Sequence, residues 1–99
     1  MTIKHLVLLR FKPDTTLADQ TECKAGFADL QKYIPGMLSF EQGSDVSPEG
    51  KNHGFEHVAA MTFIDAAARD AYLIHPAHLA FVARLSPHLA DVLVFDYAH

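Results

Sequence analysis

The sequence predicts an α+β fold in which two helical regions cover one face of a four-stranded, antiparallel-type sheet. Three observations support this prediction. Four segments of the chain are typical of strands, and in residues 2–11 and 53–64 alternate residues divide into two faces. Between these segments apolar residues recur at helical spacing, and proline or glycine marks the ends of the helical regions. The length of 99 residues suits one domain over residues 1–99 and leaves no room for a second.

The first strand is expected from Thr2 to Phe11. One of its faces holds Ile3, His5, Val7, Leu9 and Phe11. The opposite face has Leu6 and Leu8 between Lys4 and Arg10, so its middle is apolar as well. A strand that is apolar on both faces is normally covered on both sides.

A helix is expected to follow, because Thr16 lies three residues before Asp19 at the spacing of a capping box. The helix should run to about Tyr33. Its apolar stripe consists of Cys23, Phe27, Leu30 and Ile34. Pro35-Gly36 then ends it, since neither residue continues a helix well.

The middle of the chain is predicted to contain two strands joined by a polar loop. The strands are expected at Met37–Ser44 and His53–Ile64, with the loop over residues 45–52. Both faces of the later strand are largely apolar. One face holds Phe55, His57, Ala59, Met61 and Phe63, and the other Val58, Ala60, Thr62 and Ile64.

The second helical region is predicted to consist of two pieces. Asp65 is a plausible N-cap for residues 66–73, and Pro76 breaks that helix and opens another from Ala77 to about Leu85. Ser86-Pro87 stops the second piece, and a last strand is expected over Val92–Tyr97. The resulting order, βαββαβ, is typical of the ferredoxin-like sandwich, which has both helices on one face of its sheet.

That arrangement leaves one face of the sheet without helices. The apolar residues on this face are Leu6, Leu8, Val58 and Ala60. An exposed apolar patch of this size marks an interface, and a second copy packed sheet to sheet about a two-fold axis would cover it. The alternative is that these are ordinary exposed apolar residues.

The charge balance excludes several classes of partner. Eight Lys and Arg against twelve Asp and Glu give a net charge of −4, which offers no basic surface to nucleic acid or to an anionic membrane. The single Cys23 can form neither an internal disulfide nor a thiolate metal site. No apolar run is long enough for a signal peptide or a membrane span, so we expect a cytoplasmic protein.

Two of the seven histidines fall on the strand faces that the helices should cover. His5 and His57 each lie near the start of a strand, and we expect them to approach one another at one end of the core. Buried imidazoles need hydrogen-bond partners, so each could simply donate to a backbone carbonyl and fill volume. The alternative is that both line a pocket.

The segment from Tyr72 to His78 is the most informative for chemistry. His75 is the expected N-cap of the helix that Pro76 opens, and His78 lies in its first turn. The positive end of a helix disfavours an imidazolium, so His78 should be neutral and able to act as a general base. Tyr72 could supply a phenol as hydrogen-bond donor or acid. In the alternative interpretation Tyr72 packs and His78 caps backbone amides.

A zinc site is a competing interpretation of the same histidines. His75 and His78 are three residues apart, but no Cys joins them, and the carboxylates of Glu56 and Asp70 lack ligand spacing. We therefore expect no metal and no cofactor.

Four patches of the chain resemble one known family. They are residues 3–12, Ile34-Pro35-Gly36, Tyr72 with His75-Pro76-Ala77-His78, and Val94-Phe95-Asp96-Tyr97. In their order and spacing, over nearly all 99 residues, the chain resembles the stress-responsive dimeric α/β-barrel (Dabb) family. The resemblance implies a ferredoxin-like monomer and a homodimer whose two sheets close into an α/β barrel.

The resemblance also implies candidate site residues. The chain is similar to a plant polyketide cyclase of this family that closes a linear poly-β-ketone by an aldol step without a cofactor, and the acid and base residues of that enzyme match Tyr72 and His78. Pocket histidines of that enzyme match His5 and His57. The rest of the expected pocket wall is Phe27, Leu30, Phe63 and Phe81.

Two functions follow as hypotheses. In the first, the protein is a stress-associated homodimer that binds a small apolar or amphipathic ligand between its helices and sheet. In the second, it is a cofactor-independent cyclase, lyase or isomerase. His78 would then remove a proton next to a carbonyl, Tyr72 would hold or protonate the oxygen, and His5 and His57 would polarise the substrate.

Overall fold

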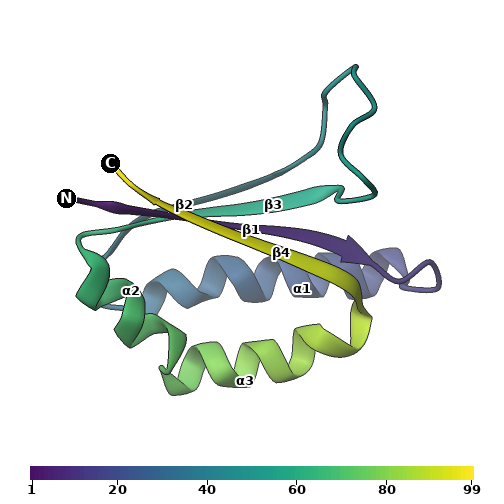
Figure 1. The fold of residues 1–99 in the computed structure, drawn as a ribbon. Helices are drawn as coiled ribbons and strands as arrows, with labels where there is room; N and C mark the ends of the chain where they lie inside the picture. Colours follow the sequence, from purple (N-terminus) through teal and green to yellow (C-terminus); the bar gives the residue numbers. More distant parts are fainter.

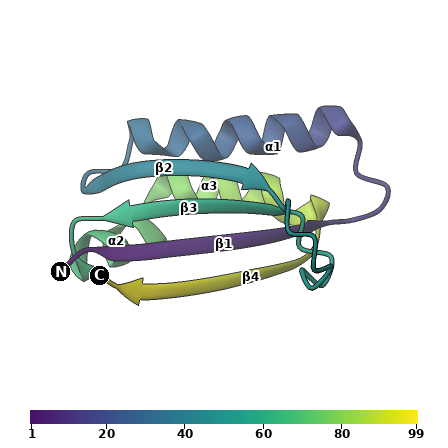
Figure 2. The same ribbon diagram turned by 90° about the horizontal axis from the view of Figure 1, so that it is seen from above.

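A single sheet of four antiparallel strands organises the chain, and the computed structural model describes all residues 1–99. The strands lie in the spatial order β2-β3-β1-β4. They are β1 (Ile3–Phe11), β2 (Met37–Ser44), β3 (His57–Phe63) and β4 (Leu89–Ala98). The helices are α1 (Leu17–Asp29), α2 (Ala66–Leu73) and α3 (Pro76–Leu85), with single 3-10 turns at Leu30–Lys32 and Ser86–His88. All three helices cover the same face of the sheet (Figure 1), and Figure 2 shows the strand order from above.

The predicted ferredoxin-like fold is therefore confirmed, and so are the signals that begin its helices. The Thr16 hydroxyl accepts from the Asp19 amide at 3.1 Å, and the Asp65 carboxylate accepts from the Ala68 amide at 2.8 Å. His75 caps α3 through Nδ1, which accepts from the Ala77 amide at 3.0 Å. Short side chains and one imidazole thus satisfy backbone amides that no helix can pair internally.

Two strand boundaries differ from the prediction by three residues or more, while the start of β1 and the ends of β3 and β4 differ by a single residue. Strand β3 begins at His57 rather than His53, because His53 and Gly54 adopt positive φ angles of 52° and 81° that an extended strand does not allow. Strand β4 begins at Leu89 rather than Val92. Its first residues still pair with the end of β1, where a bulge between Arg10 and Phe11 shifts the register.

The core fills the space between the helices and one face of the sheet. Alternate residues of β1 and β3 point into it, and the largest fully buried side chains are Leu9, Met61, Phe63 and Tyr72. From α1, Cys23 and Phe27 are buried, followed by Leu30 and Ile34. The predicted apolar stripe is thus the inner side of this helix and the turn after it.

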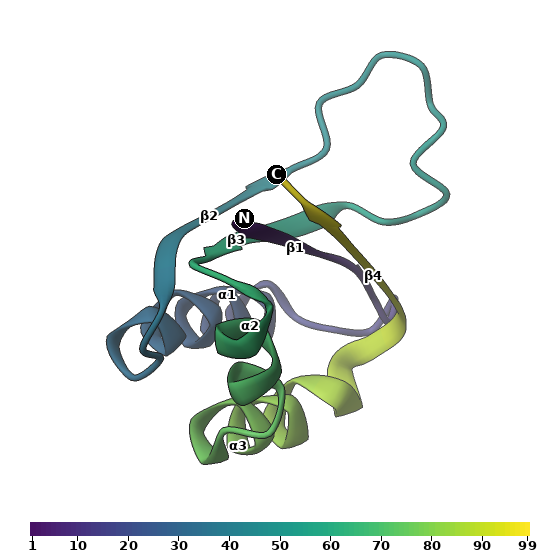
Figure 3. The same cartoon turned by 60° about the vertical axis from the view of Figure 1, so that its left-hand side comes forward.

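The opposite face of the sheet has no helix against it (Figures 1 and 3). Residues Leu6, Leu8, Val58 and Ala60 lie on this face, as predicted, and are partly exposed. Strand β4 extends the same apolar surface, because its residues alternate in register with β1. The residues it adds are Leu93, Phe95 and Tyr97, of which Phe95 is 60% exposed. We call these seven residues the open face.

The expectation that His5 and His57 approach one another is wrong. Strands β1 and β3 are antiparallel, so His5 pairs with Met61 while His57 pairs with Leu9. The starts of two antiparallel strands lie at opposite ends of the sheet. Four residue positions separate the histidines, or roughly 13 Å along the strands.

The closest contact between α1 and α3 offers a test of this packing. A Cβ placed on Gly26 would lie 2.6 and 2.9 Å from two ring atoms of Phe81, which is buried and packs edge-on against Phe27. Replacement of Gly26 by Ala should therefore lower the free energy of unfolding by about 1–2 kcal/mol, despite alanine's higher helix propensity. Urea denaturation measures this change.

Gly43→Ala is the matched control, since a Cβ at Gly43 meets no atom within 4 Å. The close packing of α1 against α3 is contradicted if Gly26→Ala is as stable as the parent chain or more stable.

Candidate functional site

One apolar cavity of about 250 Å³ lies between strands β1 and β4 and helices α2 and α3. Ten of its 13 lining residues are hydrophobic. The lining residues are His5, Val7, Phe27, Tyr72, Leu73, His78, Phe81, Val82, Leu85, Ser86, Leu89, Val92 and Val94. A cavity of this kind, with few polar groups on an apolar wall, is the usual form of a small-molecule site.

Three side chains able to exchange protons meet in this cavity. His5 comes from the helix-covered face of β1, Tyr72 from the end of α2, and His78 from the first turn of α3. The ring centroids of Tyr72 and His78 are 4.3 Å apart, and those of His5 and Tyr72 are 5.9 Å apart. We call these three residues the His5–Tyr72–His78 cluster.

His78 is held as a neutral imidazole with one free nitrogen. Its Nδ1 lies 3.1 Å from the carbonyl oxygen of Leu73, and because a carbonyl only accepts, Nδ1 bears the proton and donates. Burial lowers the pKa of His78, with smaller contributions from His5 and His75, while the Leu73 carbonyl opposes them. Nε2 is therefore a proton acceptor at neutral pH. The predicted neutrality follows mainly from burial rather than from the helix end.

Tyr72 supplies the complementary donor. It is 1% exposed, and its hydroxyl makes no hydrogen bond to another group of the chain. Burial raises the pKa of this phenol well above its usual value, so the hydroxyl stays protonated. A protonated phenol beside a neutral imidazole can donate to an oxygen while the imidazole accepts a proton.

His5 is oriented by a chain of ionic hydrogen bonds that sequence reasoning missed. Its Nδ1 lies 2.6 Å from Oδ1 of Asp96, and Oδ2 of Asp96 accepts from the Arg69 guanidinium at 2.6 Å. Arg69 also donates through Nε to Asp70 at 2.8 Å. Alternation in β4 could have placed Asp96 opposite His5, but the contact with Arg69 depends on how α2 docks on the sheet.

The other expected pocket residues divide into two groups. Phe27 and Phe81 line the cavity, with their ring centroids 4.6 Å apart. Leu30 and Phe63 are buried and do not line it. Phe63 instead lies behind the cluster, 5.1 Å from the Tyr72 ring and 6.1 Å from the His5 ring between centroids. Its contribution is to hold those two rings in place.

His57 lies outside this cavity, against a polar depression at the other end of the sheet. Its Nε2–H donates to Oε1 of Gln42 at 2.9 Å, and the Gln42 amide donates to the carbonyl of Lys24 at 3.0 Å. Burial, with a smaller effect of Lys24, lowers the pKa of His57. These bonds tie β3 through β2 to α1.

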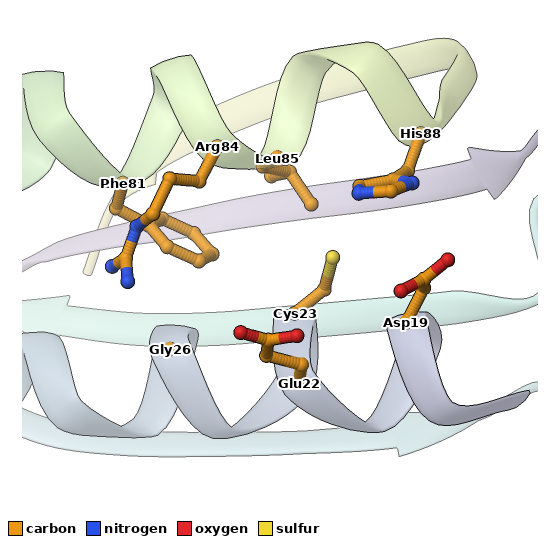
Figure 4. A pocket seen from close by; sticks show the side chains of 8 residues that line it. All are labelled: Asp19, Glu22, Cys23, Gly26, Phe81, Arg84, Leu85 and His88. Atoms are coloured by element: carbon orange, nitrogen blue, oxygen red, sulfur yellow. The ribbon is translucent and has the colours of Figure 1, made fainter.

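A further groove of about 270 Å³ runs between α1 and α3 (Figure 4). Asp19, Glu22 and Cys23 line it from α1, while Arg84 and His88 face them from the other side. Burial raises the pKa of the Cys23 thiol, so it is less reactive than a free cysteine. The structure contains no group of three or more His, Cys, Asp or Glu that could hold a metal ion. None of its helices is long and apolar enough to cross a membrane.

The fold and the cavity together define a ferredoxin-like α/β protein with an apolar cavity between its helices and its sheet. Residues 3–99 match the model of the stress-responsive A/B barrel domain, and the chain belongs to this family, Dabb. It is 34% identical to olivetolic acid cyclase of Cannabis sativa over 98% of this chain and 96% of that protein.

Solved structures agree with this assignment. Hydroxynitrile lyase from Passiflora edulis superimposes with a TM-score of 0.90 at 26% identity, covering 97% of this chain and 91% of the other. A dimeric ferredoxin-like protein of unknown function from Jannaschia sp. CCS1 superimposes with a TM-score of 0.87 at 27% identity, covering 100% of both chains.

The lowered pKa of His78 predicts a pH-dependent stability. Below about pH 6.5 the unfolded chain binds a proton at this position that the folded chain resists, so folding stability should fall as the pH drops from about 7 to about 5. Urea unfolding at a series of pH values measures the slope. In His78→Gln the slope should be smaller. An equal slope in parent and variant would contradict a lowered pKa at His78.

Proposed function

We propose that this protein is a homodimer and that each chain binds a small amphipathic ligand in the cavity. The observation that supports this most strongly is the distribution of polarity in the cavity wall. The His5–Tyr72–His78 cluster and Ser86 supply its polar groups, and Phe27 and Phe81 contribute to its otherwise apolar lining. A ligand with a hydrocarbon or aromatic part and a carbonyl or hydroxyl group matches both.

Acid–base catalysis on such a ligand is the second candidate, and a specific observation favours it. Tyr72 and His78 face the same cavity with one protonated hydroxyl and one unprotonated ring nitrogen free of partners in the chain. If both were bonded to backbone groups, proton transfer to a ligand would be blocked. The cyclase and lyase named among the related proteins are both enzymes.

The proposed step begins with removal of a proton next to a carbonyl. Nε2 of His78 takes the proton, the C–H bond breaks, and its electron pair moves into the carbonyl to form an enolate. The Tyr72 hydroxyl donates to the developing oxyanion, and His5 can assist as a second polar contact. General acid–base assistance of this kind is worth about 10²–10⁴-fold in rate, so the C–H group must already be acidic.

The open face supports the dimer. It presents aliphatic and aromatic side chains, and the loop over residues 45–56 rises from the same side of the sheet (Figures 1 and 3). A second copy packed on this face would bury both apolar surfaces at once. Solved relatives described as dimeric have the same fold. Two sheets packed in this way would form the α/β barrel of the family.

Ligand binding is testable by a thermal-shift screen of aromatic ketones and β-dicarbonyl compounds. Compounds that enter the cavity should raise the melting temperature, because they bind the folded chain alone. Val7→Phe, which fills the cavity from β1, should abolish the effect. Leu17→Ala is the matched control, since Leu17 is exposed on α1 away from the cavity. A screen in which no compound stabilises the protein would overturn the proposed site.

Catalysis is testable with the compounds that bind. Their α-proton exchange in D₂O, followed by proton NMR, should be faster with the protein than without it. His78→Gln should lose about 10²–10⁴-fold of that rate, and Tyr72→Phe should lose part of it while still binding. If the parent protein binds these compounds but does not accelerate their α-proton exchange, the ligand-binding function stands and the catalytic function is contradicted.

The dimer is testable by one substitution on the open face. Leu8→Asp places a charge on the middle strand of that face and should give a species of 11.0 kDa, or an unfolded chain, in sedimentation at micromolar concentration. Leu17→Asp, on α1, should sediment like the parent protein at about twice that mass. A parent protein that sediments as a single chain contradicts the dimer.

A further inference from the structure

The groove between α1 and α3 has walls of opposite charge (Figure 4). Asp19 and Glu22 place carboxylates along the α1 side, and Arg84 places a guanidinium on the α3 side. His88, in the 3-10 turn after α3, lies at the same end of the groove as Asp19. None of these four side chains takes part in an ion pair of the structure, so no salt bridge closes the groove.

Arg84 is oriented by an aromatic ring rather than by a carboxylate. Its Cζ lies 5.8 Å from the centroid of the Phe81 ring, within the range of a cation–π contact. Phe81 itself is fixed against Gly26, where a Cβ would lie 2.6 Å from a ring atom. The guanidinium is therefore held at the Gly26 end of the groove, and its N–H donors face no carboxylate within salt-bridge distance.

The floor between the two walls is apolar. Cys23, Phe81 and Leu85 are all buried and line it. The Cys23 thiol makes no hydrogen bond and points between the two helices (Figure 4). Burial raises the pKa of this thiol, Glu22 raises it further, and Arg84 opposes them, so the charges of both walls act on the same floor. The groove thus combines an anionic side, a cationic side and an apolar base.

Helix ends account for only part of this charge pattern. Asp19 lies in the first turn of α1 and Arg84 in the last turn of α3, where each complements the helix dipole. Glu22 lies beyond the first turn of α1, so the dipole does not explain it. A role at helix ends also gives no reason for opposite charges to line one groove without pairing.

We propose that the groove between α1 and α3 is a second binding site, for a small zwitterion with an apolar side chain such as leucine. The ligand's carboxylate accepts from the Arg84 guanidinium, and its ammonium donates to the carboxylates of Glu22 and Asp19. Its side chain lies on Phe81 and Leu85. The groove volume of about 270 Å³ suits a molecule of this size, and only a ligand with both charges matches both walls.

The test is a titration of the protein with leucine, followed by the backbone amide signals in NMR. The amides of residues 19–26 and 81–88 should shift and reach saturation. Two analogues each lack one charge: 4-methylpentanoate has no ammonium, and 3-methylbutylamine has no carboxylate. Each should bind about tenfold more weakly than leucine or worse, the loss expected for one charge-assisted hydrogen bond.

Substitutions on the two walls test the assigned contacts. Arg84→Gln and Glu22→Gln should each lower the affinity for leucine about tenfold, while Arg84→Lys, which keeps the charge, should recover part of the loss. Lys51→Gln and Glu49→Gln are the matched controls, because they make the same charge changes in the exposed loop between β2 and β3. Both controls should bind leucine like the parent protein. The amide spectrum of each ligand-free variant shows whether its fold is kept.

One further variant separates the groove from the apolar cavity, since Phe81 and Leu85 line both. Val7→Phe fills the cavity from β1 without reaching the groove, so it should leave the affinity for leucine unchanged. Loss of leucine binding in Val7→Phe would place the ligand in the cavity and overturn the proposal. The absence of a saturable shift, 4-methylpentanoate binding as tightly as leucine, or unchanged affinity in Arg84→Gln and Glu22→Gln would also overturn it.

Discussion

Burial of a sheet that is apolar on both faces is the constraint on which the rest of the structure depends. In β1, alternate residues point to opposite sides, so His5, Val7 and Leu9 enter the core while Leu6 and Leu8 face away from it. The three helices cover only one side (Figure 1). A domain of this size buries a limited fraction of its surface by itself, so covering the second side adds substantially to its stability.

The same alternation places the candidate site and the proposed interface back to back. A single strand supplies His5 to the cavity and Leu6 to the open face, and β4 supplies Val94 and Phe95 in the same way. A second copy packed against the open face would stabilise the sheet. It would therefore also fix the positions of the strands that form one wall of the cavity. The chemistry of the cluster depends on a fixed cavity wall, because the ring centroids of Tyr72 and His78 are only 4.3 Å apart.

Local signals predicted the fold well, whereas the site needed contacts between distant segments. Thr16, Asp65 and His75 cap their helices because capping depends on residues only two or three positions apart. The prediction that His5 and His57 meet was wrong because β1 and β3 run in opposite directions, which puts the starts of these two strands at opposite ends of the sheet. The Arg69–Asp96 pair joins residues 27 positions apart. It depends on how α2 docks, which no short sequence pattern encodes.

The dependence of folding stability on protein concentration tests the central claim most directly. If a second copy covers the open face, unfolding also separates two chains, so the urea midpoint must rise with concentration. A hundredfold increase should add about 2.7 kcal/mol to the apparent stability of a dimer that unfolds and dissociates together. A midpoint that stays the same across that range would mean that the sheet is stable with one side in water, which contradicts the account.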